Sequence, residues 1–229
     1  MATRFYFDND AASPLPSLAF SSGWEQTGQA DRRFSPRKVM SNNTSALANS
    51  TAITVPITTT QQILNRQYVT EPIPYKTYLA GRSFSMVIRG QENATTNNVF
   101  PNFHLRVVSM DGTIERGVLG SVMSTAGTTE WLSSQATRIF SAVGLNAFVL
   151  EAGDRLVLEL GGTANAPAAA GTFIHRHGTN ATSDFALTAA LTTDLNPWWE
   201  MSHDFWPVLP NNQQPIRAGD GISVSESWR

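Results

Sequence analysis

The segment that most constrains the fold runs from Leu150 to Gly162, LEAGDRLVLELGG, where a turn leads into an alternating stretch that ends at two glycines. Leucines occupy positions 156, 158 and 160, and the positions between them hold Arg155, Val157 and Glu159. This period of two is typical of a β-strand with one buried face. Similar segments recur from residue 52 onward, so the sequence predicts an all-β chain of short strands.

The spacing of these segments favours two packed sheets. Asp111-Gly112 is the strongest hairpin signal, and a type I′ turn is expected there because this pair tolerates positive φ. One helical turn is expected over Thr59–Asn65. Roughly ten strands exceed a seven-stranded immunoglobulin pattern, so we predict an antiparallel jelly-roll β-sandwich. The expected strands cover residues 52–58, 66–70, 77–79, 82–89, 103–107, 113–118, 138–143, 147–150, 154–160, 172–175, 185–187 and 198–205.

Two extended arms are expected to flank the sandwich. The sandwich is predicted at residues 51–206, with an N-terminal arm at 1–50 and a C-terminal arm at 207–229, since prolines interrupt strand pairing in both arms. The N-terminal arm is expected to become ordered by docking, either on its own domain or on a neighbouring subunit. The candidate interface residues are aromatic: Phe5, Tyr6, Phe7, Trp24, Phe34, Trp199, Trp206 and Trp228.

The composition excludes several classes of function. Charged residues make up only 15% of the 229 residues and the net charge is −2, which argues against a nucleic-acid partner. There is no cysteine, so disulfides and thiolate metal sites are ruled out. We find neither a signal peptide nor an apolar run of about 18 residues, and therefore expect neither export nor membrane insertion. A surface rich in Thr, Ser, Asn and Ala suits either protein contacts or simple solvation.

Two histidines give a weak indication of a metal site. His175 and His177 would project from the same face of a strand, and Asp184 or His203 could supply a third ligand. The same residues are also compatible with a strand that ends in a polar turn. We expect no metal and no cofactor.

The carboxylates give a similarly weak indication of catalysis. Glu159 is expected to meet solvent or an arginine on a neighbouring strand, and the turn after Gly153 explains Asp154. A glycosidase needs two carboxylates that face one cleft, and the sequence places no pair in that way. We therefore expect no enzymatic activity. The candidates for such a pair are Glu151, Asp154, Glu159, Glu200 and Asp204.

Trp198 and Trp199 are adjacent, so on a strand they must point to opposite faces. One of them is expected in the core. The other could be exposed to a sugar or a protein partner, or be covered by the C-terminal arm.

Several blocks of the sequence together resemble a family of virion structural proteins of tailed bacteriophages. They are Ala2-Thr-Arg-Phe-Tyr-Phe, Trp24-Glu25, Arg66-Gln-Tyr-Val-Thr with Glu71-Pro-Ile, Gly153-Asp-Arg-Leu-Val-Leu-Glu-Leu-Gly and Asn196-Pro-Trp-Trp-Glu-Met-Ser. The resemblance spans nearly the whole chain and implies a jelly-roll sandwich of the decoration or tail-associated type. It supplies no catalytic or binding residues.

The resemblance implies a place in the virion, after assembly in the host bacterial cytoplasm. The expected function is a capsid decoration or cement protein, whose arms bridge neighbouring subunits of the major capsid protein or other virion proteins. A homo-oligomer, such as a trimer, fits this role. The alternative is a tail or fibre module that binds a host glycan through Trp199 or Trp206. A depolymerising enzyme that uses Glu151 and Glu159 is a third possibility.

Overall fold

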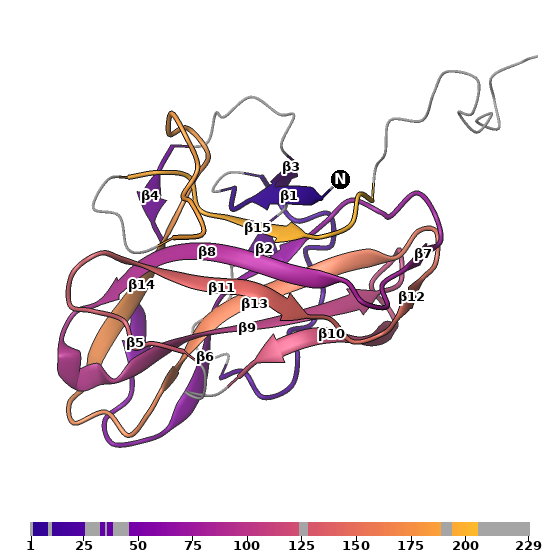
Figure 1. Ribbon diagram of the computed structural model, residues 1–229. Coiled ribbons are helices and arrows are strands. Elements are labelled where there is room, and N and C mark those ends of the chain that lie inside the picture. The colour runs from indigo at the N-terminus through magenta and orange to yellow at the C-terminus, as the bar shows by residue number, and fades with distance from the viewer. Residues whose placement is uncertain are drawn as a thin grey trace, which may run out of the picture.

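The computed structural model describes residues 2–8, 11–25, 33–34, 36–38, 46–123, 128–188 and 194–205. Two β-sheets face each other across an apolar core (Figure 1). The described residues contain no α-helix, only a 3-10 turn at Thr95–Asn97. The predicted fold class, an antiparallel jelly-roll-like β-sandwich, is confirmed.

The larger sheet has eight strands, and β8 lies at its centre. β8 pairs with β15, β14 and β11, and all three of these strands are distant from it in sequence. The order is β3 (Arg37–Lys38), β1 (Thr3–Tyr6), β15 (Trp198–Met201), β8 (Ser83–Glu92), β14 (Gly171–His177) and β4 (Ala48–Asn49), with β11 (Ala136–Gly144) on β8 and β5 (Ile53–Val55) on β14.

The second sheet has five strands and is antiparallel except where β2 meets β6. Its order is β10 (Glu115–Val122), β9 (Val99–Val108), β13 (Arg155–Ala164), β6 (Gln61–Val69) and β2 (Arg33–Phe34). A separate pair, β7 (Thr77–Tyr78) and β12 (Val149–Leu150), lies at one end of the sandwich (Figure 1).

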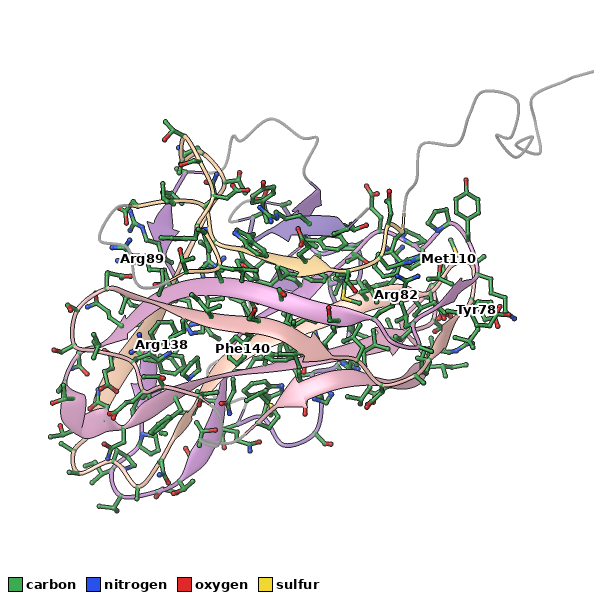
Figure 2. All side chains as sticks on the ribbon, viewed as in Figure 1. Tyr78, Arg82, Arg89, Met110, Arg138 and Phe140 are labelled. Atoms are coloured by element: carbon green, nitrogen blue, oxygen red, sulfur yellow. The ribbon has the colours of Figure 1, made fainter. Side chains whose placement is uncertain are left out.

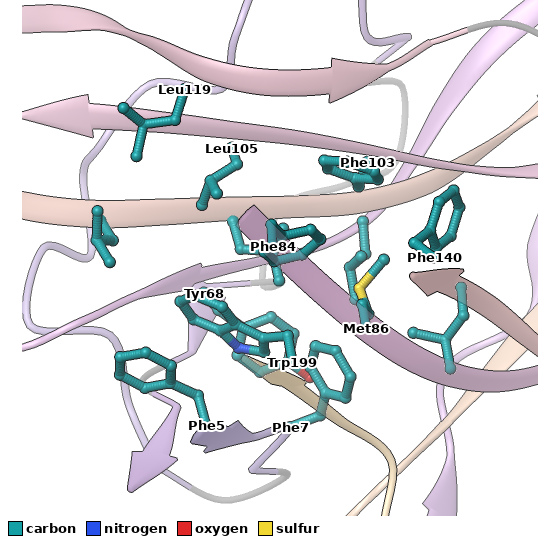
Figure 3. Packing of buried hydrophobic residues seen from close by; sticks show 14 of the residues in the cluster. Phe5, Phe7, Tyr68, Phe84, Met86, Phe103, Leu105, Leu119, Phe140 and Trp199 are labelled. Atoms are coloured by element: carbon teal, nitrogen blue, oxygen red, sulfur yellow. The ribbon is translucent and has the colours of Figure 1, made fainter. Parts of the chain in front are cut away.

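The core contains the inward side chains of both sheets. The leucines at positions 156, 158 and 160 of β13 lie in it, as their alternation predicted. Aromatic side chains join the two sheets: the ring centroids of Phe84 and Phe103 are 4.9 Å apart, and those of Phe103 and Phe140 are 5.0 Å apart (Figure 3). Edge-to-face and tilted contacts of this kind add to the stabilisation from apolar burial.

The outer face of β13 is also buried, which the sequence did not predict. Val157 packs in a second apolar layer with Leu18, Val69 and Val108. Residues 13–25 supply this cover, and the carboxylate of Glu159 beneath it is fully buried. Of the two expected environments for Glu159, solvent is therefore wrong.

Part of the predicted N-terminal arm is a strand inside the larger sheet. β1 pairs with β15 on one side and with β3 on the other. The ring of Phe5 stacks on Trp199 with centroids 4.0 Å apart, and Phe5 and Phe7 are both fully buried. This part of the arm docks on its own domain. The predicted C-terminal arm, residues 207–229, lies outside the described residues.

The hairpin at Asp111-Gly112 joins β9 and β10 as predicted, but its turn type differs. Gly112 has a φ of 75°, whereas Asp111 is absent from the positive-φ residues that a type I′ turn requires. The N–H of Gly112 donates to the carbonyl of Ser109 at 2.9 Å, and the N–H of Ser109 donates to that of Ile114 at 2.9 Å. The loop is therefore longer than two residues, with its glycine in the left-handed region.

Two local predictions were wrong. Residues 59–65 form no helical turn, because β6 begins at Gln61 and pairs with the end of β13. Residues 185–187 form no strand. Instead the N–H of Phe185 donates to the carbonyl of Asn196, which ties this segment over the outer face of β15.

Candidate contact surface and buried polar groups

The sandwich exposes several large apolar side chains at one end. Four of them lie in the β9–β10 loop and in the short strands β7 and β12, and they make up what we call the tip surface. Figure 2 shows two of them, Tyr78 and Met110, at this end. Their exposed fractions are high for residues of this size: Tyr78 64%, Met110 61%, Ile114 60% and Val149 38%.

The tip surface is held in place by the ends of both sheets. Tyr78 and Val149 are register partners across β7 and β12. The carbonyl of Met110 accepts a 2.9 Å hydrogen bond from Nε of Arg155, which anchors the β9–β10 loop to the start of β13. The Asp111 carboxylate accepts hydrogen bonds from Ser109 and Thr113, and these bonds lower its pKa to about 2. Hydrogen bonds from within the loop and from β13 therefore hold the loop in place.

Charged groups surround these apolar side chains. Lys76 and Glu151 form an exposed ion pair at 2.8 Å beside β7 and β12. Arg116 pairs with Asp154 at 3.6 Å near the start of β13. Apolar side chains rimmed by polar and charged groups are the usual composition of a protein contact surface.

The predicted interface aromatics lie elsewhere. Each one whose side chain is described is buried in the chain's own fold, and none reaches the tip surface. These are Phe5, Tyr6, Phe7, Trp24 and Trp199. The side chain of Phe34, and residues Trp206 and Trp228, lie outside the described residues.

Trp198 and Trp199 point to opposite faces of β15, as predicted, but both are buried. Trp199 is in the central core. Trp198 packs with Tyr6, Val87 and Phe185 on the outer face, and its indole N–H donates to the carbonyl of Phe185 at 2.6 Å. The guanidinium of Arg4 covers its ring at 3.8 Å. Neither indole of this pair therefore presents a face to a sugar.

The carboxylate of Glu159 is the centre of a closed hydrogen-bond network. It accepts bonds from the backbone N–H of Ser21 at 3.0 Å, from the indole of Trp24 at 2.8 Å and from the amide of Gln67 at 2.9 Å. Arg106, on neighbouring strand β9, completes it at 3.0 Å. The expected arginine partner is thus confirmed. With every oxygen occupied and no exposure to solvent, this carboxylate has a structural role.

The other candidate carboxylates are also engaged away from any shared cleft. Glu151 pairs with Lys76 at the rim of the tip surface. Asp154 accepts the backbone N–H of Glu151 at 2.9 Å within the turn that precedes β13. Glu200 pairs with Arg4 at 3.0 Å on the outer face of β15.

His175 and His177 project to the same side of β14, as predicted, and both are fully buried. Their ring centroids are 6.1 Å apart, and Nδ1 of His177 lies 2.7 Å from the hydroxyl of Tyr68. Burial and the charge of Arg66 lower the pKa of His175 to about 3 and that of His177 well below its usual value. Both imidazoles are therefore neutral at pH 7.

Neither candidate for a third metal ligand joins the two histidines. Asp184 instead accepts hydrogen bonds from Arg4 and Tyr6, and the ring of His203 packs against Phe205. Throughout the described ranges, no group of three or more His, Asp or Glu side chains could hold a metal ion. The positive charge of Arg66 also opposes a cation beside the two histidines.

A groove of about 450 Å³ lies where residues 23–25 cross the second sheet. Glu25 is its one carboxylate, and no histidine lines it. The groove therefore holds a single titratable side chain, with no second one beside it in the lining. Its residues are Gly23, Trp24, Glu25, Thr60, Gln61, Gln62 and Thr163.

Sequence reasoning missed the tip surface. Met110 and Ile114 flank the Asp-Gly turn, and large apolar residues beside a turn were the available signal. Tyr78 occupies a two-residue strand, where alternation carries no information. Among the described residues, no helix is long and apolar enough to cross a membrane.

No family model matches the chain, and no curated protein matches it. Several solved structures share a weak likeness with the chain. A CocE/NonD family hydrolase from Staphylococcus aureus matches 86% of the chain at 9% identity and a TM-score of 0.43, and the chain spans 36% of that hydrolase. The Eiger TNF of S. frugiperda matches 81% of the chain at 12% identity and a TM-score of 0.27, over 96% of its own length. An infectious bursal disease virus structure matches 88% of the chain at 10% identity and a TM-score of 0.26, over 55% of its own length.

Proposed function

We propose that this chain is a non-catalytic structural protein of a bacteriophage virion, which decorates the capsid and attaches through its tip surface. The observation that carries the proposal is the gathering of Tyr78, Met110, Ile114 and Val149, all exposed, at one end of the sandwich. The resemblance of the sequence blocks to virion structural proteins supplies the setting. The weakly charged surface, with a net charge of −2, suits contacts with other proteins.

The tip surface replaces the N-terminal segment as the attachment element. Residues 3–6 and 13–25 are used within the fold, where they complete one sheet and cover the other. Their release to bridge neighbouring subunits would expose Phe5 and Phe7. Attachment through side chains that are already exposed carries no such cost. Bridging by residues 207–229 and assembly into a homo-oligomer remain predictions.

Binding to capsids tests this proposal. We expect the double variant Tyr78→Asp/Met110→Asp to bind heads that lack the protein at least thirtyfold more weakly, because each buried anchor contributes about 2 kcal/mol. Ile57→Asp is the matched control, since Ile57 is 58% exposed and lies at the opposite end of the sandwich. Cosedimentation with purified heads measures both. Equal binding by the double variant and the wild type would disprove attachment through the tip surface.

Cryo-electron microscopy of the virion tests the location separately. Repeated density of the sandwich over the capsid shell, with β7 and β12 against the shell, is the expected result. Density confined to the tail would contradict the decoration role.

A further inference from the structure

The end of the sandwich opposite the tip surface contains two carboxyl groups in contact. Glu92 is the last residue of β8 and is fully buried. Its Oε2 accepts a 3.0 Å hydrogen bond from the backbone N–H of Val99. Its side chain also lies within hydrogen-bonding reach of the side chain of Glu130, which belongs to the segment between β10 and β11.

One oxygen of each of the two carboxyl groups has no hydrogen-bond donor among the described residues. Oε1 of Glu92 and Oε1 of Glu130 are both buried, and neither has a donor among the described residues. The positive charge of Arg138 on β11 acts on Glu92, and Figure 2 shows Arg138 away from Tyr78. Its guanidinium donates to the backbone carbonyls of Thr129, Glu130 and Thr137 instead. Two buried carboxylates in contact with no donor between them would repel each other strongly.

We propose that Glu92 and Glu130 share one proton, and that this acid–carboxylate pair latches residues 128–132 onto the end of β8. The shared proton gives each unsatisfied oxygen a partner, and the resulting O–H···O⁻ bond is of the strong, charge-assisted type. One negative charge remains, and Arg138 lies close enough to offset it.

Two backbone hydrogen bonds lie beside the Glu92–Glu130 pair and should depend on it. The N–H of Glu92 donates to the carbonyl of Leu132 at 3.0 Å, and the N–H of Trp131 donates to that of Val99 at 2.8 Å. The buried indole of Trp131 packs between Arg138 and His175, with ring contacts at 5.3 and 5.4 Å. Opening the segment breaks these bonds and exposes an indole, so its state can be measured directly.

The pH dependence follows from the environment of the pair. Burial, reinforced by the charge of Glu130, raises the pKa of Glu92 from 4.5 to about 7. In the open segment this carboxyl returns to its ordinary pKa, so the closed form holds the proton more tightly. The stabilisation by the latch is complete below about pH 4.5, declines as the pH rises, and is lost above about pH 7. His175, neutral across this range, lies beyond Trp131 and does not titrate with the pair.

Hydrogen exchange of the full chain tests the latch. We expect the protection of the Glu92, Val99 and Trp131 amides, corrected for intrinsic exchange, to fall at least tenfold between pH 5 and pH 8. In Glu92→Gln the amide donates permanently to Glu130, and protection should stay high at both pH values. Glu151→Gln, an exposed carboxylate at the tip end, is the control and should retain the wild-type dependence.

Three results would overturn the proposal. One is protection that does not change with pH in the wild type, and another is an unchanged dependence in Glu92→Gln. The third is protection at pH 8 that calcium chloride restores, since a cation rather than a proton would then join the carboxylates. Infrared difference spectroscopy gives an independent measurement, because a protonated buried carboxyl should disappear above pH 7 in the wild type and be absent from Glu92→Gln.

Discussion

Arg106 has two carboxylate partners, one buried and one exposed. Replacing each partner in turn therefore shows how burial changes the contribution of an ion pair to stability. The guanidinium is 4% exposed; it pairs with Glu159, which is 0% exposed, and with Glu115, which is 46% exposed. We expect Glu159→Gln to lower the free energy of unfolding by about 3–5 kcal/mol, because it removes the buried counter-charge. Glu115→Gln should cost less than about 1 kcal/mol, as water can replace that partner. Urea denaturation measures both, and equal losses would contradict this account.

At the scale of single residues, the alternation in the sequence predicted which face of a sheet a side chain points to. It was a poorer guide to whether that side chain is exposed to solvent. The leucines of β13 and the opposed pair Trp198 and Trp199 point as expected. The burial of Glu159, and the cover that Tyr6 and Phe185 give Trp198, were missed because segments distant in sequence cover the outer faces of both sheets. Glu92 and Glu130 were missed because the segment 128–132 folds back onto β8, and no local pattern encodes that contact.

At the scale of elements, the β9–β10 hairpin combines a correct prediction with a wrong turn type. Its Gly112 has a φ of 75°, and a Cβ there would lie 2.8 Å from Cδ1 of Leu15. We expect Gly112→Ala to destabilise the protein by about 1–2 kcal/mol, through backbone strain and displacement of Leu15. Gly144→Ala is the control, because nothing lies within 4 Å of its added Cβ and its φ is not positive. Thermal unfolding compares them, and a Gly112→Ala variant as stable as Gly144→Ala would show that the loop relaxes without cost.

The strands that could be predicted are those with long alternating sequences, such as β8, β9 and β13. The short strand β15 lies within the strand expected at 198–205, whereas β1 was assigned to the N-terminal arm and is held in place by pairing with β15 and β3. The candidate contact surface was hard to predict for a related reason. The tip surface is assembled from three chain segments, namely β7, the β9–β10 loop and β12, so its side chains share an end of the molecule without sharing a motif.

At the scale of the whole molecule, the sandwich is closed by residues from its two chain ends. β1 pairs along its full length with β15, from Thr3 opposite Met201 to Tyr6 opposite Trp198. The backbone N–H of Phe205 also donates to the hydroxyl of Thr3 at 3.0 Å. The larger sheet is therefore incomplete until the chain has been synthesised to this point, and the N-terminal strand is part of the cooperative unit.

We accordingly expect removal of residues 1–8 to abolish cooperative unfolding. The deletion takes away one strand and the buried rings of Phe5 and Phe7, each of which contributes about 3–5 kcal/mol, a large share of the stability of a domain. A chain that begins with methionine followed directly by Thr3 is the control, because Ala2 is exposed and precedes β1. Urea denaturation followed by tryptophan fluorescence distinguishes them. If the chain lacking residues 1–8 unfolds as sharply as the control, then β1 is an accessory to the sandwich, and the N-terminal segment becomes available again as an arm that bridges capsid subunits.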